Sequence, residues 1–121
     1  SGREPELITT QFLADHDLLQ ADPAYFRELV HEVPARVTAI DAALAPFLDR
    51  PAEQVDPVER AILRLGGYEL LQHPDLTSRM VINEAVELAK VFGAEQGHRF
   101  INGVLDQLAR TARPLEFVAV S

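Results

Sequence analysis

The chain has 121 residues, one domain's worth, and its hydrophobic content of 47% is enough for a core, which excludes global disorder. It has no cysteine and no apolar run long enough to cross a bilayer, which excludes disulfides, thiol chemistry and a membrane span, so we expect a cytoplasmic protein without a membrane partner. The net charge of −8 lies mainly in residues 1–60, with 5 basic and 12 acidic side chains, whereas residues 61–121 carry 6 and 7. A phosphate-facing surface, if present, is therefore expected in the second half.

The first half of the chain predicts three helical runs. Leu7, Ile8 and Phe12 set the apolar period of a first helix near residues 5–15. Asp22 before Pro23 is typical of a helix start, because Asp accepts orphan N–H bonds and proline fits the first turn.

Pro34 is expected to break or kink that second run, because it lacks an N–H and crowds the preceding turn. The apolar pattern then continues through "ARVTAIDAALAPFL".

The strongest helix start follows at Asp56, which acts as the cap while Glu59 completes a capping box. The helix is predicted to end before Pro74 and is apolar on two sides, which is typical of a central position. Its Gly66-Gly67 pair costs about 1 kcal/mol per glycine relative to alanine, a cost that close approach of a neighbouring helix can offset.

Two further helices are predicted from the stretch at residues 80–109. Gly93 is a natural stop for the first, and the second begins near Ala94 and ends at Pro114. Residues 114–121 are expected to form a loose tail. The chain is thus predicted to be all-α, a single domain over residues 1–121.

Groups that could support catalysis or bind a metal are sparse. The four histidines lie on separate predicted elements, and His31-Glu32 lacks the second histidine of a zinc-protease motif because position 35 is alanine. Ser78 lies at a predicted helix start, where capping explains it. We therefore expect no enzyme activity, no metal site and no cofactor.

Asn83 and Asn102 are the unusual polar residues, since each is embedded among apolar neighbours in a predicted helix. Asparagine is unfavourable in a helix interior because its amide competes for backbone hydrogen bonds. We favour a structural interpretation, in which buried amides tie one helix to a neighbour. The alternative is that these amides face a ligand.

Three blocks of sequence belong together: "ERAILRLGGYEL", "VINEAVELAKVFG" and "GHRFINGVLDQLA". Together they resemble the NusB transcription antitermination family, over about residues 5–110. The resemblance implies an all-helical bundle of two crossed three-helix units. It also implies RNA binding rather than catalysis: boxA-type single-stranded RNA, bound together with the ribosomal protein NusE in the RNA polymerase antitermination complex, which supports ribosomal RNA transcription.

Two alternatives stay open. One is a structural helical protein-interaction domain that has lost RNA binding, and the other is an auxiliary RNA-binding domain of a ribosomal RNA methyltransferase. Family members normally begin with an arginine-rich segment that runs into the first helix, whereas "SGREPEL" resembles the linker after it. We therefore expect that helix to be absent, residues 1–4 to be linker, and the apolar faces left uncovered to favour a homodimer through the first half.

The resemblance places RNA contacts on the last predicted hairpin. Arg99 and Phe100 form a basic–aromatic pair near a helix start, where N–H groups, positive charge and a stacking ring suit single-stranded RNA. Gln96 lies one turn earlier, within reach of a base edge, and Arg79 is a further RNA-binding candidate. Core packing of Phe100 fits the periodicity equally well.

The partner surface is assigned by the same resemblance to the outer side of the central helix, at Glu59, Arg60 and Arg64. That surface is expected to meet NusE. A solvated charged face is an equally good interpretation of these three residues.

Overall fold

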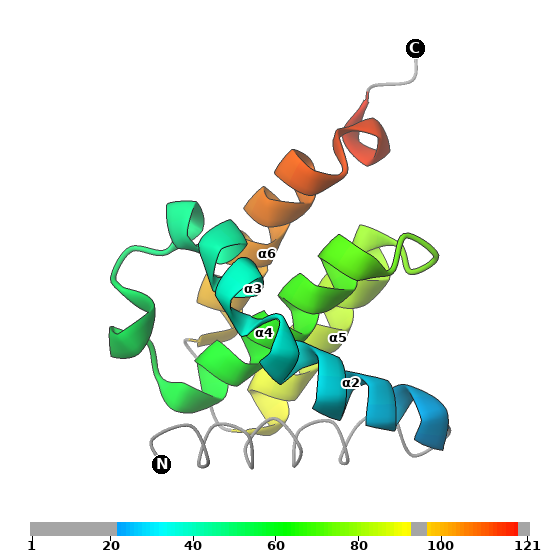
Figure 1. Ribbon diagram of the computed structural model, residues 1–121. Coiled ribbons are helices and arrows are strands. Elements are labelled where there is room, and N and C mark those ends of the chain that lie inside the picture. The colour runs from blue at the N-terminus through cyan, green and yellow to red at the C-terminus, as the bar shows by residue number, and fades with distance from the viewer. Residues whose placement is uncertain (1–21, 93–96, 119–121) are drawn as a thin grey trace.

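The fold is all-α, as predicted, in a computed structural model that describes residues 22–92 and 97–118. The first helix expected near residues 5–15 lies outside the described residues. Within those ranges the elements are helices and short 3-10 turns (Figure 1). They are α2 (Pro23–Ala35), α3 (Val37–Leu44), η2 (Ala45–Phe47), η3 (Ala52–Gln54), α4 (Pro57–Gln72), α5 (Ser78–Val91), α6 (Gly97–Ala112) and η4 (Pro114–Phe117).

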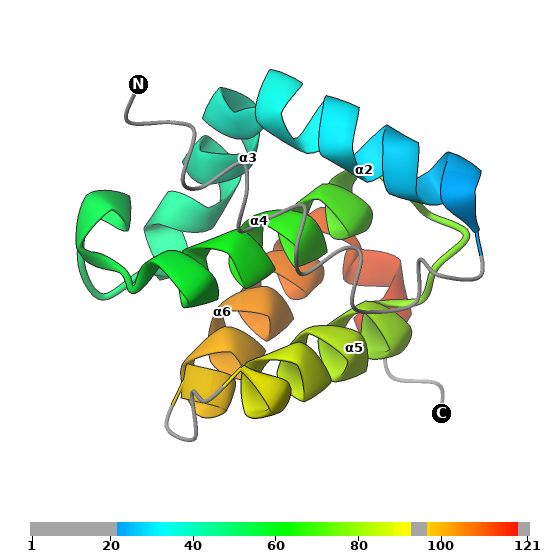
Figure 2. The same ribbon diagram turned by 90° about the horizontal axis from the view of Figure 1, so that it is seen from below.

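Helix α4 is the centre of the described structure, because every other α-helix packs against it. Helices α5 and α6 form an antiparallel hairpin on one side, and α2 crosses α4 on the other (Figure 2). From Ala61 to Leu70 every residue of α4 except Arg64 is buried. The prediction of a central helix is therefore confirmed.

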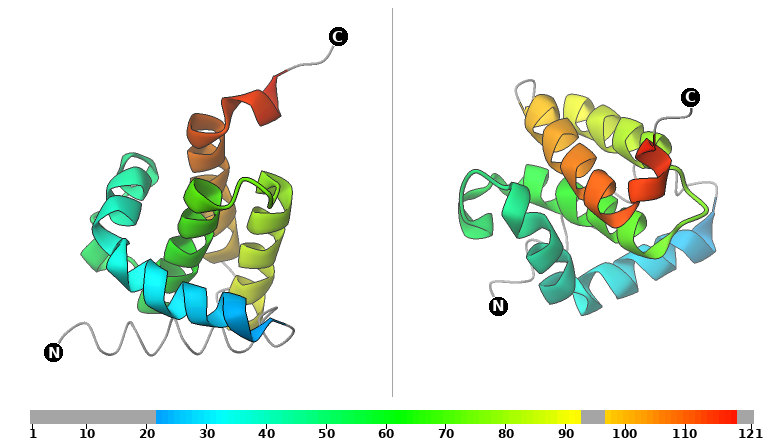
Figure 3. Two further views of the ribbon diagram at one scale, coloured as in Figure 1. Left: turned by 45° about the vertical axis from the view of Figure 1, so that its right-hand side comes forward. Right: turned by 90° about the horizontal axis from the view of Figure 1, so that it is seen from above.

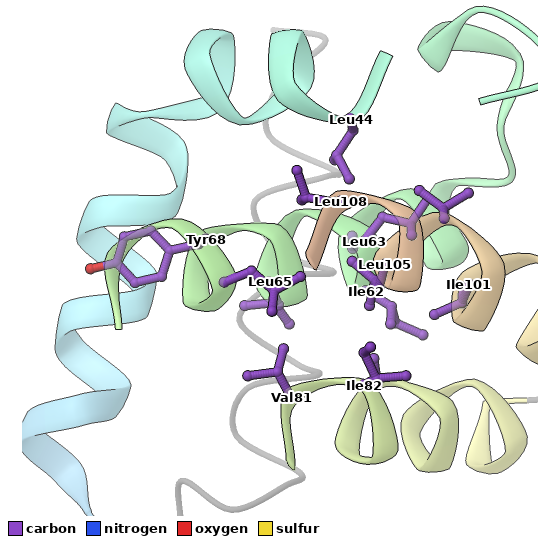
Figure 4. Packing of buried hydrophobic residues seen from close by; sticks show 14 of the residues in the cluster. Leu44, Ile62, Leu63, Leu65, Tyr68, Val81, Ile82, Ile101, Leu105 and Leu108 are labelled. Carbon is purple, nitrogen blue, oxygen red and sulfur yellow. The ribbon is translucent and has the colours of Figure 1, made fainter. Parts of the chain in front are cut away.

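The core lies where α4 meets the hairpin, as Figure 4 shows for the packed side chains. Full burial of one such aliphatic side chain stabilises the fold by about 1.5–3 kcal/mol. The largest fully buried side chains are Ile40, Ile62, Leu63, Ile101 and Leu105.

The glycine pair of α4 marks the closest approach of its neighbours. A Cβ on Gly66 would lie 2.8 Å from Cδ1 of Leu105 in α6, and one on Gly67 would lie 3.2 Å from Cγ2 of Ile40 in α3. Both distances are shorter than ordinary van der Waals contact, so the two glycines let α6 and α3 pack close to the α4 backbone. The expected close approach is confirmed.

The predicted break after α2 occurs two residues later than Pro34. Helix α2 continues through Ala35, and the chain leaves helical geometry at Arg36, with φ −109° and ψ 15°. Pro34 removes one hydrogen bond from the last turn, but the N–H of Arg36 still donates to the carbonyl of Glu32 at 2.9 Å and closes the helix.

Side-chain caps fix three helix starts. Asp22 accepts from the N–H groups of Ala24 and Tyr25, and Asp56 accepts from those of Val58 and Glu59, all at 3.0–3.1 Å. These two predicted starts are confirmed. At α5 the cap is Thr77, whose Oγ1 accepts from the N–H of Met80 at 3.2 Å, so the capping role expected for Ser78 is wrong.

The predicted loose tail is wrong for residues 114–117, which form η4 beside the end of α6 (Figure 3). The Arg113 guanidinium holds this segment against the α4–α5 connection, where Glu116 Oε1 also accepts from the N–H of Ser78 at 3.1 Å. The guanidinium donates to the backbone carbonyls of Glu69, Leu70, His73 and Leu76. Arg113 thus caps the C-terminus of α4, a long-range role that local sequence does not reveal.

Candidate functional site at the start of helix α6

Phe100 forms the centre of the candidate site. Its ring is half-buried, packs against the core from the first turn of α6, and has the Arg50 guanidinium over it, with Cζ 5.0 Å from the ring centroid. This separation is within the range of a cation–π interaction. Arg50 belongs to the connection between η2 and η3, so the fold brings together two residues that are far apart in sequence.

The Arg50 side chain is also held by its neighbour Asp49. Arg50 Nε donates to Oδ1 at 2.7 Å and Nη2 donates to Oδ2 at 3.0 Å, a bidentate pair. The side chains of Arg50 and Asp49 are 39% and 65% exposed. The Arg50 hydrogen bond lowers the pKa of Asp49, so the carboxylate is ionised at neutral pH.

Other cations lie at the same end of the α5–α6 hairpin. Arg99 is exposed directly before Phe100, and Lys90 is exposed in the last turn of α5, with its Nζ 3.8 Å from Glu87 Oε1. Gln96 lies outside the described residues. The basic–aromatic cluster, as we call it below, therefore comprises Arg50, Lys90, Arg99 and Phe100.

Arg79 is not part of this cluster. It is exposed in the first turn of α5, whereas Lys90 is in the last turn of the same helix. At about 1.5 Å per residue the two positions are roughly 16 Å apart along the axis. The structure thus separates Arg79 from Arg99 and Phe100, the other predicted RNA-binding residues that it describes.

The structural interpretation of Asn83 and Asn102 is wrong, because both side chains are exposed. The preceding residues, Ile82 and Ile101, are the ones that face the core. Each step along an α-helix turns the side chain by about 100°, so a residue next to a buried one can face solvent. Apolar neighbours in sequence therefore did not imply burial.

The three predicted partner-binding residues on α4 have different surroundings. Arg64 is only 14% exposed and donates to Asp41 from Nε at 2.9 Å and Nη2 at 2.7 Å, a bidentate pair that joins α4 to α3. Arg60 is half-buried, and its Nη1 donates to the carbonyl of Ala52 at 2.7 Å, which holds η3. The alternative of a solvated charged face is therefore wrong for Arg64, and its role in partner binding stays a prediction.

Glu59 is half-buried and lies near both Asp56 and Arg50. Burial, and then the Asp56 carboxylate, raise the pKa of Glu59 above its ordinary value, while the Arg50 guanidinium lowers it. Arg50 thus interacts with Glu59 of the predicted partner surface as well as with Phe100. The two surfaces are neighbours rather than separate faces.

A second polar cluster, not foreseen from the sequence, joins α2 to the end of α4. Tyr68 donates to Glu28 Oε2 at 2.5 Å, and His73 Nε2 lies 2.5 Å from the same oxygen. Tyr25 donates to Glu69. Burial and these carboxylates raise the pKa of both tyrosines, so their hydroxyls act as donors that hold α2 on α4.

Across residues 22–92 and 97–118, no group of three or more His, Cys, Asp or Glu side chains is placed to hold a metal ion. In the same ranges no helix has the length and apolar character to span a membrane.

Comparison with known proteins agrees with the resemblance. The model of the NusB family matches residues 3–110. Similar proteins include one from Nitrosococcus oceani, 51% identical over 116 residues, which covers 96% of this chain and 78% of the relative. One from Pseudomonas savastanoi pv. phaseolicola is 53% identical over 119 residues, or 98% of this chain and 72% of the relative.

A third relative, from Pseudomonas entomophila, is 53% identical over 109 residues, or 90% of this chain and 66% of its own length. All three are named transcription antitermination protein NusB, which describes a transcription factor rather than an enzyme. These names support a role in transcription antitermination. With a family match over residues 3–110 and identities above one half, this chain belongs to the NusB family.

Proposed function

We propose that this protein is an RNA-binding adaptor of transcription antitermination. It binds boxA-type single-stranded RNA together with the ribosomal protein NusE, within the RNA polymerase antitermination complex, and so supports transcription of ribosomal RNA operons. Family membership supports the antitermination role. The observation that carries the RNA-binding part is the Phe100 ring at the surface, with Arg50 over it and the exposed Arg99 beside it.

Single-stranded RNA suits this cluster because its unpaired bases stack on aromatic rings and guanidinium planes. Each stacked base contributes about 1–3 kcal/mol, and neighbouring cations neutralise the backbone. The inner part of the Phe100 ring packs on the core, which holds the ring in a fixed position. The two interpretations of Phe100, core residue and RNA contact, are thus compatible.

The adaptor role follows from the charge of the chain. With a formal net charge of −8, the protein alone neutralises few phosphates and binds RNA weakly. A basic partner supplies positive charge and a second surface that contacts the RNA. Because the two proteins are bound to each other, the RNA binds the pair more tightly than it binds either protein alone.

For NusE we propose the outer surface of α4 around Glu59. This carboxylate is half-buried and suits a basic group on the partner. Arg60 and Arg64 hold η3 and α3 beside it through Ala52 and Asp41, so they shape the surface.

The test is a titration of labelled boxA-type RNA with and without NusE, on the wild type and on Phe100→Leu. Leucine keeps most of the apolar packing but removes the stacking face, so we expect binding in the presence of NusE to weaken about tenfold. Asn102→Ala, on the exposed face of the same helix, is the matched control and should bind like the wild type. Equal RNA binding with and without NusE would contradict the adaptor role.

A further inference from the structure

Asp49 occupies Arg50 donors that an RNA phosphate would otherwise use. The carboxylate takes the Nε and Nη2 edge of the guanidinium in a bidentate pair. A phosphate is recognised by the same planar fork, so the two anions compete for one edge. The Asp49 side chain is 65% exposed and that of Arg50 39%, so the carboxylate can leave the pair for solvent at small cost.

The guanidinium is also placed where an RNA strand would pass. It lies over the Phe100 ring, at the same end of α6 as Arg99, although Arg50 comes from the connection between η2 and η3. In the described part of the chain its Nη1 makes no hydrogen bond, so at least this nitrogen is available before Asp49 is displaced.

We propose that Arg50 contacts the RNA backbone beside Phe100, and that Asp49 is a competing carboxylate that holds the affinity for RNA down. This inference rests on the proposed function and adds to it a residue pair that sets affinity. The Arg50–Asp49 pair is neutral as a unit, so loss of the Asp49 charge leaves one cation more at the cluster. On binding, the phosphate takes the place of the carboxylate, and Asp49 returns to water.

The chain contains a matched control at the far end of the same helix. Arg110 lies over Phe117, with Cζ 4.5 Å from the ring centroid, and its Nε donates to Asp106 at 2.9 Å. This unit lies roughly 15 Å from Phe100 along α6. That distance exceeds the Debye length of about 8–10 Å at moderate salt, so a charge change there acts on RNA at the cluster only weakly.

The experiment compares Asp49→Asn with Asp106→Asn, which remove the same charge from similar Arg–Phe units. Affinity for labelled boxA-type RNA is measured by fluorescence anisotropy in the presence of NusE. We expect Asp49→Asn to bind about two- to fivefold more tightly than the wild type, in line with an exposed ion pair. We expect little change for Asp106→Asn.

Arg50→Ala completes the test. It should weaken binding and lower the slope of log affinity against log salt by about 0.7, the value for one phosphate on a single strand. In this background Asp49→Asn should give a clearly smaller gain, because only the repulsion between the carboxylate and the RNA backbone remains to be removed. Thermal melts of each variant check that the fold is retained.

The inference is overturned if Asp49→Asn and Asp106→Asn have equal effects, or if the gain from Asp49→Asn is as large without Arg50 as with it. An effect of Phe100→Leu without any effect at Asp49 overturns this inference and leaves the proposed function standing. Absence of RNA binding by the wild type with NusE overturns both.

Discussion

The two ends of helix α6 carry the same local unit in different surroundings. At each end an arginine lies over a phenylalanine ring and is held by an aspartate: Asp49, Arg50 and Phe100 at the start. The unit at the other end consists of Asp106, Arg110 and Phe117. At the start, Arg99 and Lys90 add exposed positive charge.

At the far end the added cation is used internally. Arg113 is only 10% exposed, and its guanidinium donates to backbone carbonyls at the end of α4 and at the start of the turn to α5. The comparison teaches that an arginine–phenylalanine contact does not by itself identify a binding site. The neighbouring groups decide whether the charge faces a ligand or closes the fold.

The largest expected effect distinguishes the two ends by stability. Arg113→Ala leaves buried carbonyls of the α4–α5 connection without donors, so we expect a loss of about 3 kcal/mol in the free energy of unfolding. Arg50→Ala, at the exposed end, should change it by less than about 0.5 kcal/mol. Urea unfolding followed by circular dichroism measures both.

Arg113→Lys serves as the control for charge. Lysine keeps the positive charge but not the planar fork that reaches several carbonyls at once, so most of the loss should remain. Full rescue by lysine would mean that charge alone, and not the geometry of the cap, stabilises this end.

How much of this was predictable from the sequence depends on the range of the interaction. Asp22 and Asp56 act on backbone groups two and three residues away, and both caps were predicted correctly. The roles of Arg50 and Arg113 depend on residues brought near by the fold, from about 40 to 50 positions away, and no local pattern indicates them.

The wrong predictions have a similar cause. Asn83 and Asn102 were judged by their apolar neighbours in sequence, although in a helix the residues three and four positions away share a face. Arg64 was placed on an open face because its partner Asp41 comes from another helix. Gly66 and Gly67, by contrast, could be interpreted correctly, since the cost of two glycines in a helix itself indicates close packing.

The next prediction compares two glycine-to-alanine changes, one where α4 packs against the middle of α6 and one on the outer side of α6 itself. Gly66→Ala pushes a methyl group against Leu105 of α6, so we expect a loss of about 1–3 kcal/mol despite the better helix propensity of alanine. A Cβ on Gly103 meets nothing within 4 Å, so Gly103→Ala should stabilise the protein by about 0.5–1 kcal/mol. Thermal or urea unfolding decides the sign of each change; stabilisation by Gly66→Ala would show that the α4–α6 contact is looser than described.

Ligand binding should separate the two ends of α6 directly. Arg99→Ala removes an exposed cation at the start, so RNA binding should weaken about fivefold and its salt dependence should flatten, while NusE binding is unchanged. Arg110→Ala, at the far end, should leave RNA binding close to that of the wild type. If the two variants weakened RNA binding equally, the assignment of the RNA surface to the start of α6 would be wrong.

A charge reversal on α4 tests the proposed NusE surface, which lies next to the basic–aromatic cluster. Glu59→Lys should weaken NusE binding by about fivefold to tenfold, because a like charge then faces the basic partner. Glu53→Lys, an equal charge change on the exposed η3, is the control. RNA binding without NusE should not fall in either variant; a fall would mean that Glu59 acts on the RNA cluster through Arg50.

The smallest expected effect is a pH dependence of stability at the far end of α6, where the carbonyl of His73 accepts a hydrogen bond from Arg113. Burial lowers the pKa of His73, but the hydrogen bonds and charges of Glu28 and Asp75 raise it, and the net shift is upward. Glu28, Asp75, Glu69, Tyr25 and Tyr68 are the titratable groups around the ring.

A histidine with a raised pKa in the folded state stabilises the fold fully below its unfolded pKa of about 6.5, and this stabilisation is lost as pH rises through the folded pKa. We therefore expect the free energy of unfolding to fall by less than about 1 kcal/mol between ~pH 6 and ~pH 8, and His73→Gln to remove that part of the slope. Urea unfolding at the two pH values measures it. If the slope of the unfolding free energy against pH is unchanged in His73→Gln, protonation of His73 does not strengthen the packing of α2 on α4 through Glu28.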